Sequence, residues 1–311
     1  MPEGDTIYRT ARALGKALAG RVVTGFETAL AKLARLNDDA PLVGRVVEKV
    51  EARGKWCLIF FSGDLILVTH MLMSGSWHLY RTGERWQLPR RAMRVAITCG
   101  EMQAVGFNVP VAEFHTARSL IRSGSRSGQV PRLGMDVLGA DYSVEAGARA
   151  LKEYGAAHPE AEVAEVLLNQ RVIAGLGNVY KSEVAFAADV HPFRKMSTMT
   201  EREMERMAEA AQRFLRANVM EGTEAQMVTY SGGRRTTHDV DRNNRLWVYG
   251  RRGEECRRCG AAIEMRRQGT GARVTYWCPS CQPWVPAEEQ SNDAPRGGRR
   301  RLAGVRRKTS C

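Results

Sequence analysis

The sequence predicts an α+β protein of several domains, and three patterns along its 311 residues support that fold class. Apolar residues recur at helical spacing within the first twenty residues. Short β-rich stretches separated by glycines then occupy residues 22–116, as in a mainly antiparallel sandwich or barrel. Helical periodicity returns between residues 144 and 219, and two close cysteine pairs follow it. We therefore expect a β-rich domain led by a helix, a helical domain and a small C-terminal module.

The N-terminal helix is predicted by apolar residues at spacings of four, three and four, namely Ile7, Ala11, Leu14 and Leu18. Asp5 or Thr6 can cap its start, and Gly20 follows its end. The segment Pro2-Glu3-Gly4 therefore stands directly before a packed helix. Because free chain ends usually fray unless they are tied down, we expect this terminus to be held in place.

Six strands are expected in the β-rich part, at residues 45–51, 56–61, 65–70, 76–80, 93–98 and 103–107. Strands do not alternate with helices there, which argues against a doubly wound fold and a nucleotide cofactor. Residues 122–132 are rich in glycine, serine and arginine, as in a linker or mobile loop. Helices are expected at 144–153, 162–168, 178–188 and 200–219, the last beginning with a capping box of Thr200 and Glu203.

These patterns divide the chain into five parts. We expect an N-terminal domain at residues 1–121, a linker at 122–140, a helical domain at 141–250 and a cysteine-rich module at 251–285. Residues 286–311 are polar and basic with few large apolar side chains, a composition that predicts a disordered tail.

Positive charge dominates the composition. Lysine and arginine number 47 against 34 acidic residues, which gives a net charge of +13. Such an excess attracts polyanions, and nucleic acid is the commonest of these, although a ribosome-associated or simply soluble basic protein remains an alternative. No apolar run approaches the roughly 18–20 residues of a membrane span, and no signal peptide is visible. We expect a cytoplasmic, nucleoid-associated protein.

Four of the seven cysteines form two C-x2-C pairs, Cys256 with Cys259 and Cys278 with Cys281, separated by the eighteen residues 260–277. This spacing is typical of a four-cysteine zinc site, and four thiolates leave no open coordination position, so we expect one structural Zn²⁺. A redox pair or two disulfides are the alternatives. Buried free thiols are expected for the two isolated cysteines that lie in predicted strands, Cys57 and Cys99.

Three further features could contact DNA. The turn Gly175-Leu-Gly177-Asn178 precedes a helix, whose N-terminus attracts anions, although such turns also occur for purely steric reasons. Lys55 follows Gly54 on a turn into an apolar strand and suits either a phosphate contact or simple solvation. Met73, in the segment from His70 to Gly75, is either an apolar wedge for a base stack or a core residue.

The N-terminus itself can carry covalent chemistry. The small residue Pro2 favours removal of Met1, which exposes a secondary amine. Terminal amines titrate near about 7.7–8.0, so an unprotonated fraction exists at neutral pH and can attack a sugar C1′. Glu3 beside it could transfer protons. Proline at position two is common, however, and does not by itself indicate catalysis.

The order of these features resembles that of the formamidopyrimidine-DNA glycosylase and endonuclease VIII family. The matching segments are Pro2-Glu3-Gly4, Arg53-Gly54-Lys55, His70 to Gly75, Gly175 to Tyr180, Val248 to Gly253 and both cysteine pairs with the intervening Arg273 to Cys278. The resemblance implies a β-sandwich led by a helix, a helix–two-turns–helix domain, a zinc-finger hairpin and damaged DNA as partner.

The resemblance also implies residue roles. Pro2 would be the nucleophile and Glu3 the acid/base, with Lys55 completing the catalytic group. Lys55, Asn178 and Arg273 would hold phosphates, and Met73 would be an inserting residue. The implied protein is a monomeric glycosylase/AP lyase of base excision repair that cleaves the strand by β,δ-elimination.

Departures from the family pattern bear on the substrate. The opening Pro2-Glu3-Gly4-Asp5-Thr6 is similar to the endonuclease VIII branch, and Thr6 stands where members commonly carry a second glutamate. Residues 106–114 lack the Asp-Pro-Arg-Arg-Phe motif that fills the space opposite an oxidised purine. We therefore favour oxidised pyrimidines and abasic sites as substrates. A non-catalytic zinc protein that binds lesions or other nucleic acid is the alternative.

Overall fold

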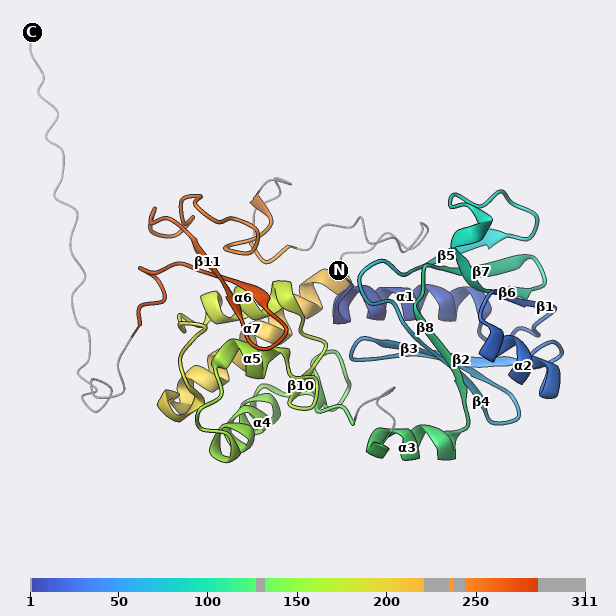
Figure 1. Ribbon diagram of the computed structural model, residues 1–311, viewed down its shortest axis with the longest axis horizontal. Helices are drawn as coiled ribbons and strands as arrows, with labels where there is room; N and C mark the ends of the chain where they lie inside the picture. The colour runs from blue at the N-terminus through green and yellow to red at the C-terminus, as the bar shows by residue number, and fades with distance from the viewer. Residues whose placement is uncertain (1, 127–131, 221–234, 238–243, 285–311) are drawn as a thin grey trace, which may run out of the picture.

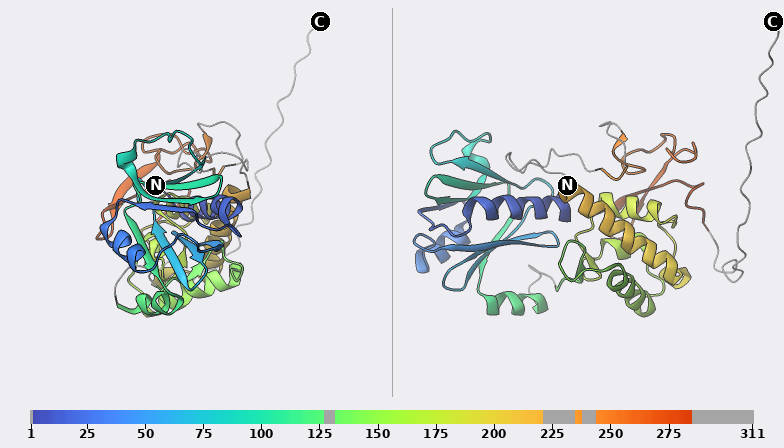
Figure 2. Two further views of the ribbon diagram at one scale, coloured as in Figure 1. Left: turned by 90° about the vertical axis from the view of Figure 1, so that its right-hand side faces the viewer. Right: turned by 180° about the vertical axis from the view of Figure 1, so that it is seen from behind.

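The structure, a computed structural model, describes residues 2–126, 132–220, 235–237 and 244–284. The predicted basic tail and residues 127–131 of the predicted linker lie outside these ranges. Figure 1 shows a β-rich part and a helical part side by side along the longest axis, with the N-terminus at the junction between them. Seen from behind in Figure 2, α1 and α7 lie nearly end to end across this junction. None of the described helices is long and apolar enough to cross a membrane.

The N-terminal part is a β-sandwich built around helix α1 (Gly4–Leu18). One sheet has the order β1 (Gly25–Thr28), β6 (Met93–Cys99), β7 (Met102–Phe107), β5 (Ser76–Arg81). The other has the order β2 (Val47–Arg53), β3 (Trp56–Phe61), β4 (Leu65–His70), β8 (Val111–His115). All neighbouring strands are antiparallel. The apolar face of α1 packs against strands of both sheets, which confirms the predicted sandwich led by a helix (Figure 1).

Several details differ from the sequence prediction. Helix α2 (Ala31–Asp39) and strands β1 and β8 were not expected, and helix α3 (Ala117–Arg126) crosses the predicted boundary at residue 121. The cap of α1 is Glu3, whose side chain makes no capping hydrogen bond, and not Asp5 or Thr6. The reason is a tertiary contact, because the Glu3 carboxylate accepts a hydrogen bond from the distant Val179 amide instead. The thiols of Cys57 and Cys99 are buried and free, as expected.

The helical part contains α4 (Val144–Ala157), α5 (Val163–Leu168), α6 (Asn178–Ala187) and α7 (Glu201–Met220). Two-residue strands β9 (Met135–Asp136) and β10 (Ile173–Ala174) pair in parallel before and after α4 and α5. The predicted capping box at the start of α7 is present. The Thr200 amide donates to Glu203 Oε2 at 2.9 Å, and the Glu203 amide donates to Thr200 Oγ1 at 3.3 Å. Short 3₁₀ turns occur at Arg90–Ala92 and Met196–Thr198.

The C-terminal module is a hairpin of β11 (Glu264–Gln268) and β12 (Arg273–Trp277) that packs on α6 (Figure 1). The buried side chains of Val248, Cys256, Ile263 and Cys278 share one apolar cluster with Phe186 of α6. This packing joins the cysteine-rich module to the helical part, so α6 contacts elements on both of its sides.

Candidate active site and zinc centre

Pro2 and Glu3 are buried where the two halves of the molecule meet. The Gly4 amide donates to the Gly175 carbonyl at 2.8 Å. A Cβ on Gly4 would lie 2.8 Å from the Gly175 Cα atom, so this approach requires glycine. Gly175 has a φ of +101°, which also favours glycine. The predicted anchoring of the N-terminus is therefore achieved by a direct backbone contact with the glycine turn.

The carboxylate of Glu3 occupies the N-terminus of α6. Its Oε1 accepts from the Val179 amide at 3.0 Å and its Oε2 from the Tyr180 amide at 3.4 Å. A Cβ on Gly177 would lie 2.3 Å from Glu3 Cδ, which explains the second glycine of the turn. The positive end of a helix favours an anion, and here the anion is a side chain of the protein itself. The glycine turn thus positions Glu3, where the sequence had left a phosphate contact and a steric role as alternatives.

The turn that carries Lys55 packs against the same glycine turn. Gly54, with a φ of +56°, donates its amide to Asp136 Oδ2 at 2.6 Å. A Cβ at Gly54 would lie 3.2 Å from the Cβ of Ala174. Burial raises the pKa of Asp136 despite the hydrogen bonds from Gly54 and Leu138. Sequence reasoning missed Asp136, because only its long-range contact distinguishes it from other acidic residues.

Lys55 also lies close to the segment that carries Met73. Burial, together with the charge of Lys55, lowers the pKa of His70 to about 4. His70 Nδ1 accepts from the Leu72 amide at 3.0 Å. Met73 is 64% exposed and Leu72 is 46% exposed with a φ of +46°, whereas Met71 is buried. Of the two roles left open for Met73, the core role is wrong, and an exposed apolar tip remains.

Asn178 and Arg273 lie on opposite sides of the contact between α6 and the hairpin. Asn178 is the first residue of α6; its Nδ2 donates to the Tyr249 hydroxyl at 3.5 Å, and its buried Oδ1 has no partner among the described residues. Arg273 is exposed at the start of β12. The Tyr276 amide donates to Ser182 Oγ at 3.3 Å, which ties β12 to α6. Asn178 and Arg273, the two residues predicted to contact phosphates, therefore lie on α6 and on the strand β12 that packs against it.

Glu183 is a buried residue of α6 that sequence reasoning did not assign. Its Oε1 accepts from the amides of Val248 at 2.9 Å and Tyr249 at 2.8 Å. Its Oε2 accepts from the Trp247 amide at 2.9 Å and from the Thr236 hydroxyl. An acidic residue in a helix whose other residues are almost all buried was the available signal. Glu183 anchors the start of the C-terminal module to α6.

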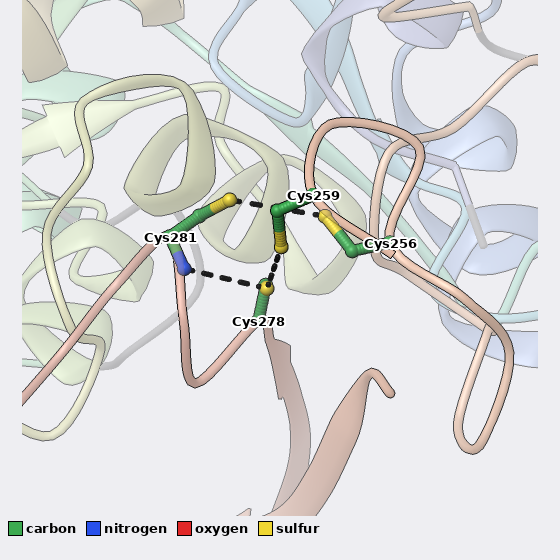
Figure 3. Close-up of side chains that lie close together, drawn as sticks. All are labelled: Cys256, Cys259, Cys278 and Cys281. Carbon is green, nitrogen blue, oxygen red and sulfur yellow. Dashed lines mark hydrogen bonds between the residues drawn. The ribbon is translucent and has the colours of Figure 1, made fainter. Parts of the chain in front are cut away.

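The four cysteines of the predicted zinc site converge (Figure 3). Cys256 Sγ and Cys281 Sγ are 3.9 Å apart, Cys259 Sγ and Cys278 Sγ are 3.4 Å apart, and all four sulfurs lie within 4.8 Å of one another. A tetrahedron with Zn–S bonds of about 2.3 Å has S–S edges of about 3.8 Å, so the cluster fits Zn²⁺. None of these cysteines is in a disulfide. With four thiolates as ligands, the zinc is structural.

Comparison with known proteins gives three family matches. Residues 1–110 match the formamidopyrimidine-DNA glycosylase N-terminal domain, residues 133–229 the H2TH domain of the same glycosylase, and residues 253–283 the zinc finger found in FPG and IleRS. A protein named probable endonuclease 8 2 from Streptomyces coelicolor is 37% identical over 98% of this chain and 99% of its own length. The chain belongs to the formamidopyrimidine-DNA glycosylase and endonuclease VIII family.

One further relative supports this membership, and one solved structure shares the fold. The DNA-(apurinic or apyrimidinic site) lyase Nei2 of Mycolicibacterium smegmatis is 35% identical over 91% of this chain and 99% of its own length. The Lactococcus lactis Fpg, solved in a complex with DNA containing an abasic site, matches with a TM-score of 0.72 and 21% identity. That match covers 91% of this chain and 100% of the Fpg chain, and it shows a shared fold. The predicted combination of sandwich, helix–two-turns–helix domain and zinc finger is confirmed.

Proposed function

We propose that this DNA glycosylase/AP lyase of base excision repair uses the amino group of Pro2 as its nucleophile once Met1 has been removed. The family assigns the reaction class, and the position of the N-terminus supports the choice of nucleophile. The single observation that carries the proposal is the buried Pro2-Glu3 pair, held at the junction by the Gly4–Gly175 contact. Anchoring a chain end so closely is unusual unless its position matters.

The chemistry follows from an amine beside a carboxyl group. The Pro2 nitrogen forms a bond to C1′ of the damaged nucleotide, the bond from C1′ to the base breaks, and the base departs with a proton. Glu3 supplies a proton to the sugar ring oxygen, so the sugar opens and an iminium ion forms. Removal of a C2′ proton then expels the 3′ phosphate, and a second elimination expels the 5′ phosphate. This sequence leaves a gap in the strand.

Three side chains are proposed to hold the phosphates around the damaged nucleotide. Lys55 on the β2–β3 turn, Asn178 at the start of α6 and Arg273 on β12 come from three structural units that adjoin the glycine turn or α6. Phosphate contacts position a protein on DNA without reading its sequence. Met73, exposed on the loop after β4, is proposed to enter the base stack when the nucleotide leaves it.

Oxidised pyrimidines and abasic sites are the proposed substrates. The endonuclease VIII type of N-terminal segment supports this preference, and so does the similarity to proteins named endonuclease 8 2. We further propose that the protein acts as a monomer in the cytoplasm and that its domains follow the boundaries predicted from the sequence. The arrangement of elements supports these boundaries except at α3, which crosses residue 121, and at β9, which lies within the predicted linker but pairs with β10 of the helical part.

Borohydride trapping tests the nucleophile. Purified protein whose N-terminus has been verified by mass spectrometry is incubated with DNA that contains one abasic site, and borohydride is added. A covalent adduct that maps to Pro2 is the expected result, and protein that retains Met1 should give none. Absence of an adduct with correctly processed protein would contradict the proposal and favour a lesion-binding protein without catalysis. Oligonucleotides with single oxidised pyrimidines or purines then rank the substrates.

A further inference from the structure

Lys181 is a buried cation one turn into α6, three residues after Asn178. Its side chain is 1% exposed, and among the described residues no hydrogen bond or ion pair reaches its amine. Lysine is almost never fully buried without a partner, because a desolvated ammonium group is unfavourable. An apolar side chain of similar length would fill the same space without that cost. The packing of α6 therefore does not explain why a lysine occupies this position.

Three charged groups on other elements act electrostatically on the Lys181 amine. They are Arg273 on β12, Glu165 on α5 and Glu3 at the N-terminus. Burial and then the Arg273 guanidinium lower the pKa of Lys181 to about 8, and the two carboxylates oppose this shift in part. The amine is therefore mostly protonated at neutral pH, so the molecule holds two positive charges close together.

The packing of the hairpin on α6 brings these two cations together. The Tyr276 amide donates to Ser182 Oγ, next to Lys181 in the sequence. The turn of the hairpin lies against α5, where a Cβ on Gly269 would come 2.4 Å from Glu165 Oε1. Lys181 is buried and adjoins Ser182, which contacts the hairpin, whereas Arg273 is exposed to solvent. Repulsion between the two cations is relieved when an anion binds at Arg273.

We propose that Lys181 is a further DNA-binding residue, which forms with Arg273 a two-cation site for one backbone phosphodiester beside the damaged nucleotide. Arg273 makes the outer contact, and Lys181 adds its charge from the interior, where the field is less screened by solvent. The site recognises the charge of the phosphate and no particular base. This inference rests on the proposed function, because it uses the same phosphate contact of Arg273.

The test measures binding to DNA with a tetrahydrofuran abasic analogue, which is not cleaved, as a function of salt. Lys181→Met should weaken binding about ten-fold, as expected for one charge-assisted contact. It should also reduce the slope of log K against log salt by about one. Lys181→Arg should retain most of the affinity. The control Lys152→Met removes a lysine of α4 that pairs with Glu201, and it should bind like the wild type.

A double-variant cycle tests whether both cations serve one phosphate. Lys181→Met should cost clearly less in an Arg273→Met background than in the wild type, because the phosphate contact is already weakened there. Raising the pH through about 8 should weaken binding more in the wild type than in Lys181→Met, since only the wild type loses this charge. The thermal midpoint of Lys181→Met should be unchanged or higher, which excludes unfolding as the cause.

The proposal is overturned if Lys181→Met binds with the wild-type affinity and salt slope, or if the losses of the two single variants add in the double variant. It is also overturned if Lys181→Met binds normally but gives no borohydride adduct at saturating DNA, because the lysine would then act in the chemistry. Failure of the proposed function has a different signature, which is absence of the adduct in the wild type.

Discussion

Two buried carboxylates on the two sides of α6 are held in different ways. Glu183 accepts from three backbone amides and a hydroxyl, all at the attachment of the C-terminal module. Within the part of the chain that the structure describes, Glu3 accepts from two amides, at the positive end of the helix. A carboxylate with every acceptor site occupied suits a fixed anchor, whereas one with acceptor capacity left can exchange a proton with a substrate.

The comparison suggests that α6 separates two tasks. Its interior fixes the zinc-bearing module through Glu183, and its N-terminus orients Glu3 beside Pro2. Glu183 is fully buried, and this burial raises its pKa even though four hydrogen bonds oppose that shift. Substitutions where the C-terminal module attaches to α6 should therefore change stability and DNA affinity. Substitutions at the N-terminus of α6 should change the cleavage rate.

Removal of zinc should have the largest effect. Structural zinc sites contribute about 10–16 kcal/mol of binding free energy in zinc-finger peptides, so a chelator should unfold residues around the four cysteines. The hairpin that carries Arg273 would then no longer be held against α6. Metal analysis before and after chelation, followed by DNA binding, checks this. Full DNA affinity in zinc-free protein would contradict it.

Glu3→Gln comes next and should act on rate alone. Loss of a general acid/base lowers a rate by about 10²- to 10⁴-fold. The amide oxygen of glutamine can still accept from Val179 or Tyr180, so we expect the free energy of unfolding to change by less than about 1 kcal/mol. Single-turnover cleavage and denaturant titration measure the two quantities. A variant that cleaves normally would remove Glu3 from the mechanism.

Glu183→Ala should lower stability and have little effect on the cleavage rate. It leaves the amides of Trp247, Val248 and Tyr249 without their acceptor in a buried region. Unsatisfied buried donors cost about 1–3 kcal/mol each before relaxation, so we expect a loss of about 3 kcal/mol in unfolding free energy. Chemical denaturation measures it. If this variant were as stable as the wild type but slow in cleavage, the assignment of the two carboxylates would be reversed.

Gly177→Ala should displace Glu3 at the N-terminal end of α6. The added methyl group would meet Glu3 Cδ at 2.3 Å and push the carboxylate from the Val179 and Tyr180 amides. Overpacking of this kind costs about 1–3 kcal/mol. We expect slower cleavage with unaltered zinc content. Gly15→Ala is the control, because its Cβ would meet only the Val50 side chain at an ordinary 3.8 Å and its φ is not positive.

Asp136→Asn should have the smallest effect. A carboxyl whose pKa is raised on folding contributes stability below its unfolded pKa near 3.8 and loses that contribution as the pH rises through its folded pKa. At pH 7 the charged form is therefore unfavourable, but asparagine has one acceptor oxygen and can accept from the Gly54 amide or the Leu138 amide, not from both. Because relief of the buried charge offsets the lost hydrogen bond, we expect Asp136→Asn to change the free energy of unfolding by no more than about 1 kcal/mol at pH 7. The stability of the variant relative to the wild type should fall as the pH falls toward 4, and thermal melts over this range measure it.

Features that depend on short windows of residues follow from the sequence alone. The face of α1, the capping box of Thr200 and Glu203, and the zinc spacing all follow from local periodicity or local geometry. The family pattern added the helix–two-turns–helix architecture. Six of the eight sandwich strands were also predicted, because glycine turns separate them.

The way in which these elements contact one another depends on long-range tertiary contacts. The hydrogen bond from Val179 to Glu3 joins residues 176 positions apart, and the one from Gly54 to Asp136 joins residues 82 positions apart. No local pattern encodes such pairs, because a carboxylate has the same propensities wherever its partner lies. The roles of Glu183 and Lys181 are hidden for the same reason: the position of α6 against the hairpin determines their burial.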